Sequence, residues 1–142
     1  KVYQTLIGNH PVKLIKGATY DIVKNAKAAL VCSGTATLET ALLNCPQVVC
    51  YKFGNISYWI GRLVIKVKYI SLVNLVMDQV IVKELIQGEM NARLIGEELS
   101  KLVEGGSKRD TMFSEFTELR TKLGGSGASA RVAEHIRSYL KK

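Results

Sequence analysis

The sequence has few of the residues that mark disulfide-bonded or zinc-binding proteins. Its three cysteines, Cys32, Cys45 and Cys50, form no C-x-x-C pair, and His10 and His135 stand far apart. The common zinc-ligand spacings are therefore excluded, and an odd number of cysteines argues against a disulfide framework. We expect the cysteines to be small buried residues in a reducing compartment, and we expect no metal and no cofactor.

Long apolar runs are also missing, since none reaches the roughly 18 residues of a membrane span. The most apolar stretch, residues 56–82, is interrupted by Arg62, Lys66, Lys68 and Asp78. With 142 residues, of which 47% are hydrophobic and 23% charged, the composition is typical of one globular domain. The chain starts without Met and without a signal-like segment, so we expect a cytoplasmic piece of a longer protein.

Acidic residues are scarce in the first part of the chain. Residues 1–83 contain ten Lys and Arg but only Asp21, Glu39 and Asp78 as acids, whereas residues 84–142 are nearly balanced. Most of the net charge of +8 therefore lies in the first part. This bias predicts an anionic partner, which charge alone leaves open as nucleic acid, a phosphorylated substrate or an acidic membrane surface.

The first fifty residues alternate between patterns typical of strands and of helices. Strands are predicted at 11–15, 28–32 and 47–51, and helices at 19–26 and 37–44. Residues 28–32 are a continuous apolar run, as in strands buried on both faces, and residues 47–51 are expected to form another buried strand. This order predicts βαβ units and a Rossmann-like parallel sheet with flanking helices. Three strands make a small sheet, so further strands are expected to be missing from the chain or to lie within residues 2–6.

The rest of the chain predicts a run of helices. Apolar residues recur at helical spacing in 58–66, 91–103, 112–123 and 132–140. The glycine-rich segment 124–127 follows no buried strand, so a helix end and a turn are favoured there over a phosphate-binding loop. The fold class is therefore α/β, ending in a helical run.

The turn after the second predicted strand carries the strongest functional pattern. Ligands of open parallel sheets bind beyond the carboxyl ends of the strands, where helix amino termini favour phosphate. Gly34 would let backbone approach a ligand, Ser33, Thr35 and Thr37 add hydroxyls, and the Glu39 carboxylate suits a ribose diol. The alternative is an ordinary helix cap with Glu39 as a stabilising first-turn acid, and the local pattern alone favours that alternative.

Four segments in one order and spacing resemble the C-terminal half of lipid-A-disaccharide synthases: Ser33–Glu39, Pro46–Lys52, Lys66–Leu75 and Lys83–Gln87. The resemblance extends from about Pro11 to Leu140. It implies the C-terminal half of a GT-B type glycosyltransferase. Members join UDP-2,3-diacylglucosamine to 2,3-diacylglucosamine 1-phosphate, release UDP and require no metal. Residues 1–142 would then be one partial, donor-binding domain that lacks the acceptor domain and the general base, and is inactive alone.

The resemblance also implies a set of residues that bind the UDP-sugar donor: Ser33, Gly34, Thr35, Thr37, Glu39, Tyr51, Asn74, Glu84 and Gln87. The Asn74 amide would hydrogen-bond the donor sugar or the diphosphate, and it is the one candidate in this chain for a catalytic contact. Glu84 and Gln87, three residues apart, are expected on one helix face, where they would contact sugar hydroxyls. The alternative for this pair is a solvated helix face.

Two further interpretations stay open. Tyr58, Trp59 and Ile60 stand among basic residues, which suits either an anionic inner-membrane surface or packing on the sheet. The whole chain could instead belong to another enzyme that uses UDP-N-acetylglucosamine, such as an epimerase or a peptidoglycan-precursor glycosyltransferase. A basic nucleic-acid-binding domain is supported by charge alone, because no nucleic-acid-binding motif is present, so no nucleic-acid partner is expected.

Overall fold

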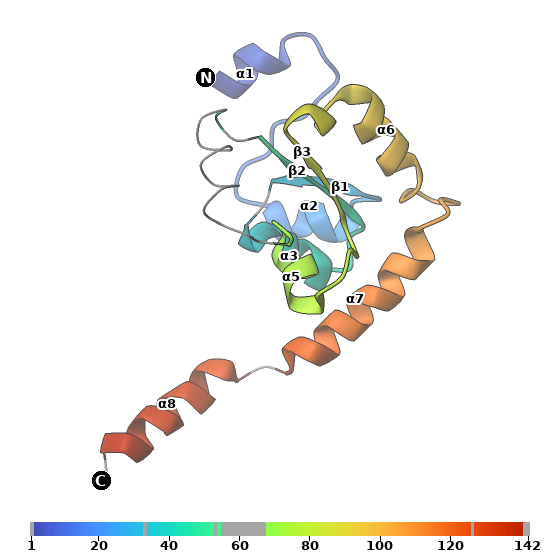
Figure 1. Ribbon diagram of the computed structural model, residues 1–142. Helices are drawn as coiled ribbons and strands as arrows, with labels where there is room; N and C mark the ends of the chain where they lie inside the picture. Colours follow the sequence, from blue (N-terminus) through green and yellow to red (C-terminus); the bar gives the residue numbers. More distant parts are fainter. Residues whose placement is uncertain (1, 33, 53, 55–67, 126, 141–142) are drawn as a thin grey trace.

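The computed structural model describes residues 2–32, 34–52, 54, 68–125 and 127–140. It contains a three-stranded sheet with helices on both sides and a helical run at the end of the chain (Figure 1). The elements are, in chain order, α1 (Val2–Ile7), α2 (Thr19–Asn25), β1 (Ala29–Cys32), α3 (Thr35–Leu42), β2 (Gln47–Tyr51), α5 (Leu72–Met77), β3 (Lys83–Ile86), the 3₁₀ turn η1 (Gln87–Glu89), α6 (Ala92–Ser100), α7 (Arg109–Leu123) and α8 (Ala128–Leu140). The predicted α/β class is confirmed.

The sheet is parallel and has the order β1-β2-β3. The central strand β2 has the predicted bounds, and four of its five residues are buried. The prediction that β1 is buried on both faces is wrong, because Leu30 is 49% exposed and Cys32 is also exposed. These two residues alternate with Val31, which is buried, so one face of β1 is covered and the other is open.

The third strand is not the one that the sequence predicted. Residues 11–15 form no strand, and their side chains are exposed, while residues 2–6 belong to helix α1. The alternating pattern at 11–15 is present, but a strand needs a hydrogen-bonded neighbour, and the described residues offer it none. The third strand is instead β3, whose residues Lys83–Ile86 directly follow the β-branched run Val80–Val82 and pair with β2.

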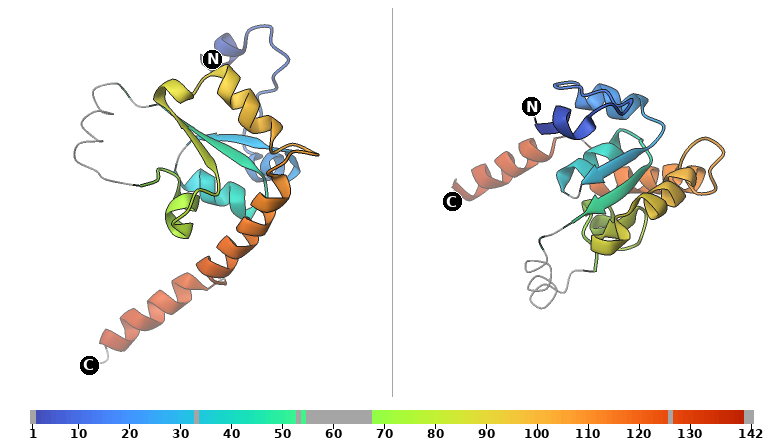
Figure 2. Two further views of the ribbon diagram at one scale, coloured as in Figure 1. Left: turned by 45° about the vertical axis from the view of Figure 1, so that its right-hand side comes forward. Right: turned by 90° about the horizontal axis from the view of Figure 1, so that it is seen from above.

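Helices cover the two faces unequally. Helices α3, α5 and α7 contact one another on one face of the sheet, and α6 lies against β2 and β3 on the other (Figures 1 and 2). The helical spacing predicted for α7 is confirmed, since Met112, Phe116 and Leu119 are buried in the core. Burying each such side chain contributes about 1.5–3 kcal/mol, so α7 is a main support of the sheet.

Helix α7 is also bound to the end of α3 by an arginine. The Arg120 Nη2 donates hydrogen bonds to the carbonyls of Ala41, at 3.4 Å, and Leu42, at 3.2 Å, and to the Asn44 Oδ1, at 3.2 Å. These carbonyls belong to the last turn of α3, where the regular helical hydrogen bonds end, and the Ala41 carbonyl also accepts one from the Asn44 amide at 3.0 Å. The guanidinium therefore caps α3 from a neighbouring helix.

The last helix stands apart from the sheet. Gly124 ends α7 with a φ of 77°, which confirms the predicted glycine helix end. Helix α8 then extends away from the rest of the chain, and all of its side chains are exposed (Figure 1). No helix among the residues that the structure describes is both long enough and apolar enough to cross a membrane.

Candidate functional site

The turn between β1 and α3 presents an open helix amino terminus. Gly34 is the residue before the helix, with a φ of 132°, a conformation that side chains disfavour. Gly34 makes no side-chain cap, and among the described residues a Cβ built on it would meet no atom within 4 Å. Thr35 is exposed as the first residue of α3. The first amides of a helix have no acceptor within it, so this end suits an anion. Ser33 lies outside the described residues.

Thr37 holds this turn together from inside. Its side chain is fully buried, and its Oγ1 donates a 2.8 Å hydrogen bond to the Gly34 carbonyl. Its own carbonyl accepts a 2.7 Å hydrogen bond from the Gln47 Nε2. Direct contact between Thr37 and a donor stays a prediction, and in this structure its hydroxyl shapes the turn.

Gln47 is the one buried side chain of the described residues with an unpaired polar atom. It is fully buried at the start of β2, under α3, and its Oε1 has no hydrogen-bond partner among the described residues. An unpaired buried acceptor is unfavourable by about 1–3 kcal/mol. The Gln47 side chain therefore makes one stabilising hydrogen bond and leaves one buried acceptor unpaired.

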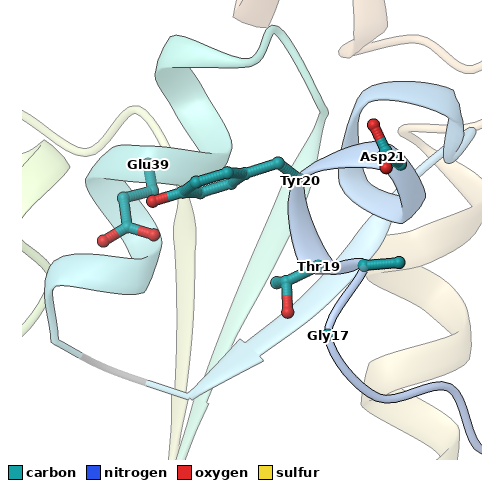
Figure 3. A pocket seen from close by; sticks show the side chains of 6 residues that line it. Gly17, Thr19, Tyr20, Asp21 and Glu39 are labelled. Atoms are coloured by element: carbon teal, nitrogen blue, oxygen red, sulfur yellow. The ribbon is translucent and has the colours of Figure 1, made fainter.

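Glu39 lies beside a pocket that sequence reasoning missed. The pocket has a volume of about 470 Å³ and is lined by Gly17, Ala18, Thr19, Tyr20, Asp21 and Glu39. Glu39 is exposed, and it is the fifth residue of α3 rather than a first-turn acid, so the helix-stabilising alternative loses its main support. The side chain of Tyr20 points from α2 towards Glu39 (Figure 3).

The amino end of α2 reaches this pocket because α2 leads directly into β1. The helix and the strand run in opposite directions, so the start of α2 lies near the carboxyl end of β1. Gly17, with a φ of 83°, turns the chain there. Thr19 is the first residue of α2, and Ala18 is in the cap position, where it makes no side-chain hydrogen bond. In the sequence, this part of the site is marked only by Gly17, which stands two residues before the predicted helix.

The charged groups around the pocket indicate which chemical groups of a ligand it could bind. Its described lining contains the carboxylates of Asp21 and Glu39 and no basic side chain. Such a lining suits neutral groups that donate hydrogen bonds, including sugar hydroxyls, and repels phosphate. The open amino terminus of α3 at Gly34 has the opposite preference. A ligand with a hydroxylated ring and a phosphate would therefore match both parts.

Glu84 and Asn74, which the sequence also assigned to the donor, lie together in a polar cluster with Ser71. The Glu84 Oε1 accepts hydrogen bonds from the Ser71 amide at 2.9 Å, the Ser71 hydroxyl at 2.8 Å and the Asn74 Nδ2 at 2.9 Å. The Glu84 Oε2 accepts one from the Ile70 amide at 3.0 Å. We call Ser71, Asn74 and Glu84 the buried polar cluster.

Asn74 is fully buried, and each polar atom of its side chain is paired. Its Oδ1 accepts hydrogen bonds from the amides of Ile81, at 2.9 Å, and Val82, at 3.0 Å, and its Nδ2 also donates to the Val82 carbonyl at 2.9 Å. The amide thus fixes the chain that enters β3 against α5. Contact between Asn74 or Glu84 and a donor stays a prediction, while the structure gives both side chains internal partners.

The predicted shared helix face of Glu84 and Gln87 is wrong. Glu84 lies in β3, and Gln87 begins η1 with a φ of 52°. The i and i+3 spacing places two residues side by side only in a helix, and the β-branched residues before Glu84 favour a strand. Tyr51 is half-buried at the carboxyl end of β2, the position that the sequence predicted.

The cysteines follow the prediction in two of three cases. Cys45 and Cys50 are buried, whereas Cys32 is exposed at the end of the edge strand β1. No three His, Cys, Asp or Glu side chains gather as metal ligands within the described ranges. The predicted helix at 58–66 and the aromatic and basic residues around Trp59 lie outside the described residues.

Comparison with known proteins gives consistent relatives. A family model described as Lipid-A-disaccharide synthetase matches residues 2–135. Proteins named Lipid-A-disaccharide synthase are similar to the chain: 47% identity over 131 residues in Syntrophus aciditrophicus, 41% over 127 in Myxococcus xanthus and 40% over 135 in Hahella chejuensis. These matches cover 92%, 89% and 95% of this chain, but 34%, 33% and 34% of the relatives. The chain thus spans about a third of the length of the curated relatives it matches.

Proposed function

This chain belongs to the lipid-A-disaccharide synthetase family of glycosyltransferases, and on that premise we propose that it supplies the binding site for the UDP-sugar donor. The observation that carries the proposal is the open amino terminus of α3 at Gly34 beside the pocket that contains Glu39. One part suits a diphosphate and the other a hydroxylated ring, which are the two components of a nucleotide.

In the proposed arrangement the uridine occupies the pocket and the diphosphate meets the start of α3. The Glu39 carboxylate accepts hydrogen bonds from the ribose diol, and the Tyr20 ring offers an apolar surface to the base. Gly34 and Thr35 present backbone amides to the diphosphate. Tyr51, at the carboxyl end of β2, lies on the sheet edge towards which the sugar would extend.

The proposed reaction of the whole enzyme joins UDP-2,3-diacylglucosamine to 2,3-diacylglucosamine 1-phosphate. A hydroxyl of the acceptor attacks the anomeric carbon of the donor, the bond from that carbon to the diphosphate breaks, and UDP leaves. The general base that takes the hydroxyl proton and the acceptor site belong to a part of the enzyme outside this chain. We therefore expect this chain alone to form no disaccharide.

Departing UDP gains negative charge, and the proposal assigns its stabilisation to the protein without a metal. The α3 amides and helix dipole act there, and the positive net charge of the first part of the chain favours an anion at longer range. Acylated substrates fit a cytoplasmic enzyme in peripheral contact with the anionic inner membrane. The residues around Trp59 that suggested this contact are outside the described part, so it rests on substrate chemistry.

The experiment is an NMR titration of the chain with three probes. UDP should shift amides at both 17–21 and 34–39, uridine mainly those at 17–21 with Glu39, and inorganic pyrophosphate mainly those at 34–36. This division tests the two halves of the site separately. UDP shifts that fall on α6, α7 and α8 instead would overturn the proposed site.

A further inference from the structure

Two cysteines stand side by side at the edge of the proposed site. Cys32 ends β1, Cys50 lies in β2, and they are Cα partners in the parallel register. Partners in neighbouring strands are about 4.8 Å apart, within the roughly 4.4–6.8 Å that separates the Cα atoms of disulfide-bonded cysteines. Partners in a parallel pair also point to the same face of the sheet. The two thiols are therefore neighbours on one face.

The two thiols differ in their access to solvent. Cys32 is exposed, whereas Cys50 is 6% exposed. Burial raises the pKa of the Cys50 thiol, and the neighbouring Cys32 raises it further, so Cys50 is held mainly as the thiol. Leu30, which is 49% exposed, shows that this part of the sheet face is open beside Cys32. A small oxidant in solution therefore meets Cys32 first.

We propose that Cys32 and Cys50 form a redox-modification site, at which a hydroperoxide converts the pair of thiols into a disulfide. The Cys32 thiolate attacks one oxygen of the peroxide, the O–O bond breaks, and Cys32 becomes a sulfenic acid while hydroxide leaves. The Cys50 sulfur then attacks the Cys32 sulfur, the S–S bond forms, and the sulfenic hydroxyl leaves as water with the Cys50 proton. Both cysteines are oxidised, the peroxide is reduced, and a low-molecular-weight dithiol reverses the change.

The modification would act on donor binding, and this part rests on the proposed function. Cys32 comes two residues before Gly34, and Cys50 directly precedes Tyr51. A disulfide would restrain the carboxyl ends of β1 and β2 and shift the turn that presents the α3 amides. We expect the dissociation constant for UDP to rise by about tenfold, since a shift of the amides weakens a phosphate contact worth about 1.4 kcal/mol.

The site itself is tested on the 142-residue chain by treatment with hydrogen peroxide, blocking of the remaining thiols and peptide mapping by mass spectrometry. The expected product is monomeric, lacks the mass of two hydrogens and has a peptide that links Cys32 to Cys50. Cys45→Ser is the matched control and keeps the link, whereas Cys32→Ser and Cys50→Ala each abolish it. Irreversible oxidation of Cys32 with Cys50 unlinked, or a Cys32–Cys32 dimer, would overturn the site.

The effect on binding is tested by calorimetry with UDP on the reduced, oxidised and re-reduced chain. The oxidised chain should bind about tenfold more weakly, re-reduction should restore the affinity, and Cys50→Ala should show no loss after brief peroxide treatment. Equal affinity of the reduced and oxidised chain overturns the regulatory effect. Absence of UDP binding to the reduced chain overturns the proposed function instead, and the peptide map still decides whether the disulfide site exists.

Discussion

The site around Glu39 and the buried polar cluster around Glu84 contain similar residues with opposite surroundings. Glu39 is exposed beside a pocket, while Glu84 accepts four hydrogen bonds from its own chain. The family resemblance implied that both carboxylates bind the same ligand. Glu39 is therefore open to a solute, whereas Glu84 already has hydrogen-bond partners within the fold. Burial and hydrogen-bond partners, rather than residue type, make this distinction.

The largest effect is expected from Asn74→Ala. The substitution leaves the amides of Ile81 and Val82 and the Val82 carbonyl without their partner, so the free energy of unfolding should fall by about 3 kcal/mol. Urea denaturation measures this loss. Asn91→Ala is the control. The Asn91 side chain also accepts a hydrogen bond from a backbone amide, but it is exposed, so the free energy of unfolding should fall by only about 1 kcal/mol. An equally small loss for Asn74→Ala, together with loss of UDP binding, would make Asn74 a ligand residue instead.

Glu84→Gln should have the second largest effect, a fall of about 2 kcal/mol in the free energy of unfolding. The side-chain NH₂ that replaces one carboxylate oxygen would face hydrogen-bond donors that then have no acceptor. UDP affinity of the folded variant should change little. Denaturation and calorimetry on one sample give both quantities. A stable Glu84→Gln variant that binds UDP poorly would contradict the internal role of this carboxylate.

The same substitution at Glu39 should have the reverse outcome. Loss of a charge-assisted hydrogen bond to the ribose, worth about 1.5 kcal/mol, should weaken UDP binding about tenfold. Stability should be nearly unchanged, since Glu39 is exposed. Glu97→Gln serves as the control, because Glu97 is also an exposed acid on a helix. It pairs with Arg93 and has no proposed part in donor binding. Unchanged UDP affinity of Glu39→Gln would remove Glu39 from the site.

The smallest effect is expected from Gln47→Met, and it is an increase in stability. Gln47→Met keeps the side-chain volume and removes the unpaired Oε1, while the Thr37 carbonyl keeps its place in the helical hydrogen-bond pattern. We expect the free energy of unfolding to rise by about 1 kcal/mol. Exposed Gln79→Met should leave stability within about 0.5 kcal/mol of the original chain. A loss for Gln47→Met would show that the hydrogen bond to Thr37 outweighs the unpaired oxygen.

The sequence predicted those parts of the fold whose signals are local. The apolar residues Val48–Tyr51 predicted β2, and the glycine after α7 marked the end of that helix. The strand prediction at 11–15 failed because pairing depends on a neighbour far away in the chain. Exposure of Cys32 was missed for the same reason, since the position of a strand within a sheet is not written in its own residues.

The candidate site was predicted in part. The turn at Gly34 and the helix with Glu39 followed from a strand-turn-helix pattern, and the structure places both where a ligand can reach them. The residues at 17–21 were not assigned, because a pocket is formed by segments that become neighbours only after folding. The internal partners of Asn74 were equally invisible, since they depend on the path of the chain into β3.

The hydrogen bonds of α3 hold the helix near both of its ends. Arg120 of α7 donates to carbonyls at its carboxyl end, while near its amino end the Thr37 Oγ1 donates to the Gly34 carbonyl and the Gln47 Nε2 of β2 donates to the Thr37 carbonyl. The amides at the start of α3 are therefore already ordered by the fold before any ligand arrives. An anion that binds there needs to immobilise little of the protein, so the entropic cost of association at this end is small.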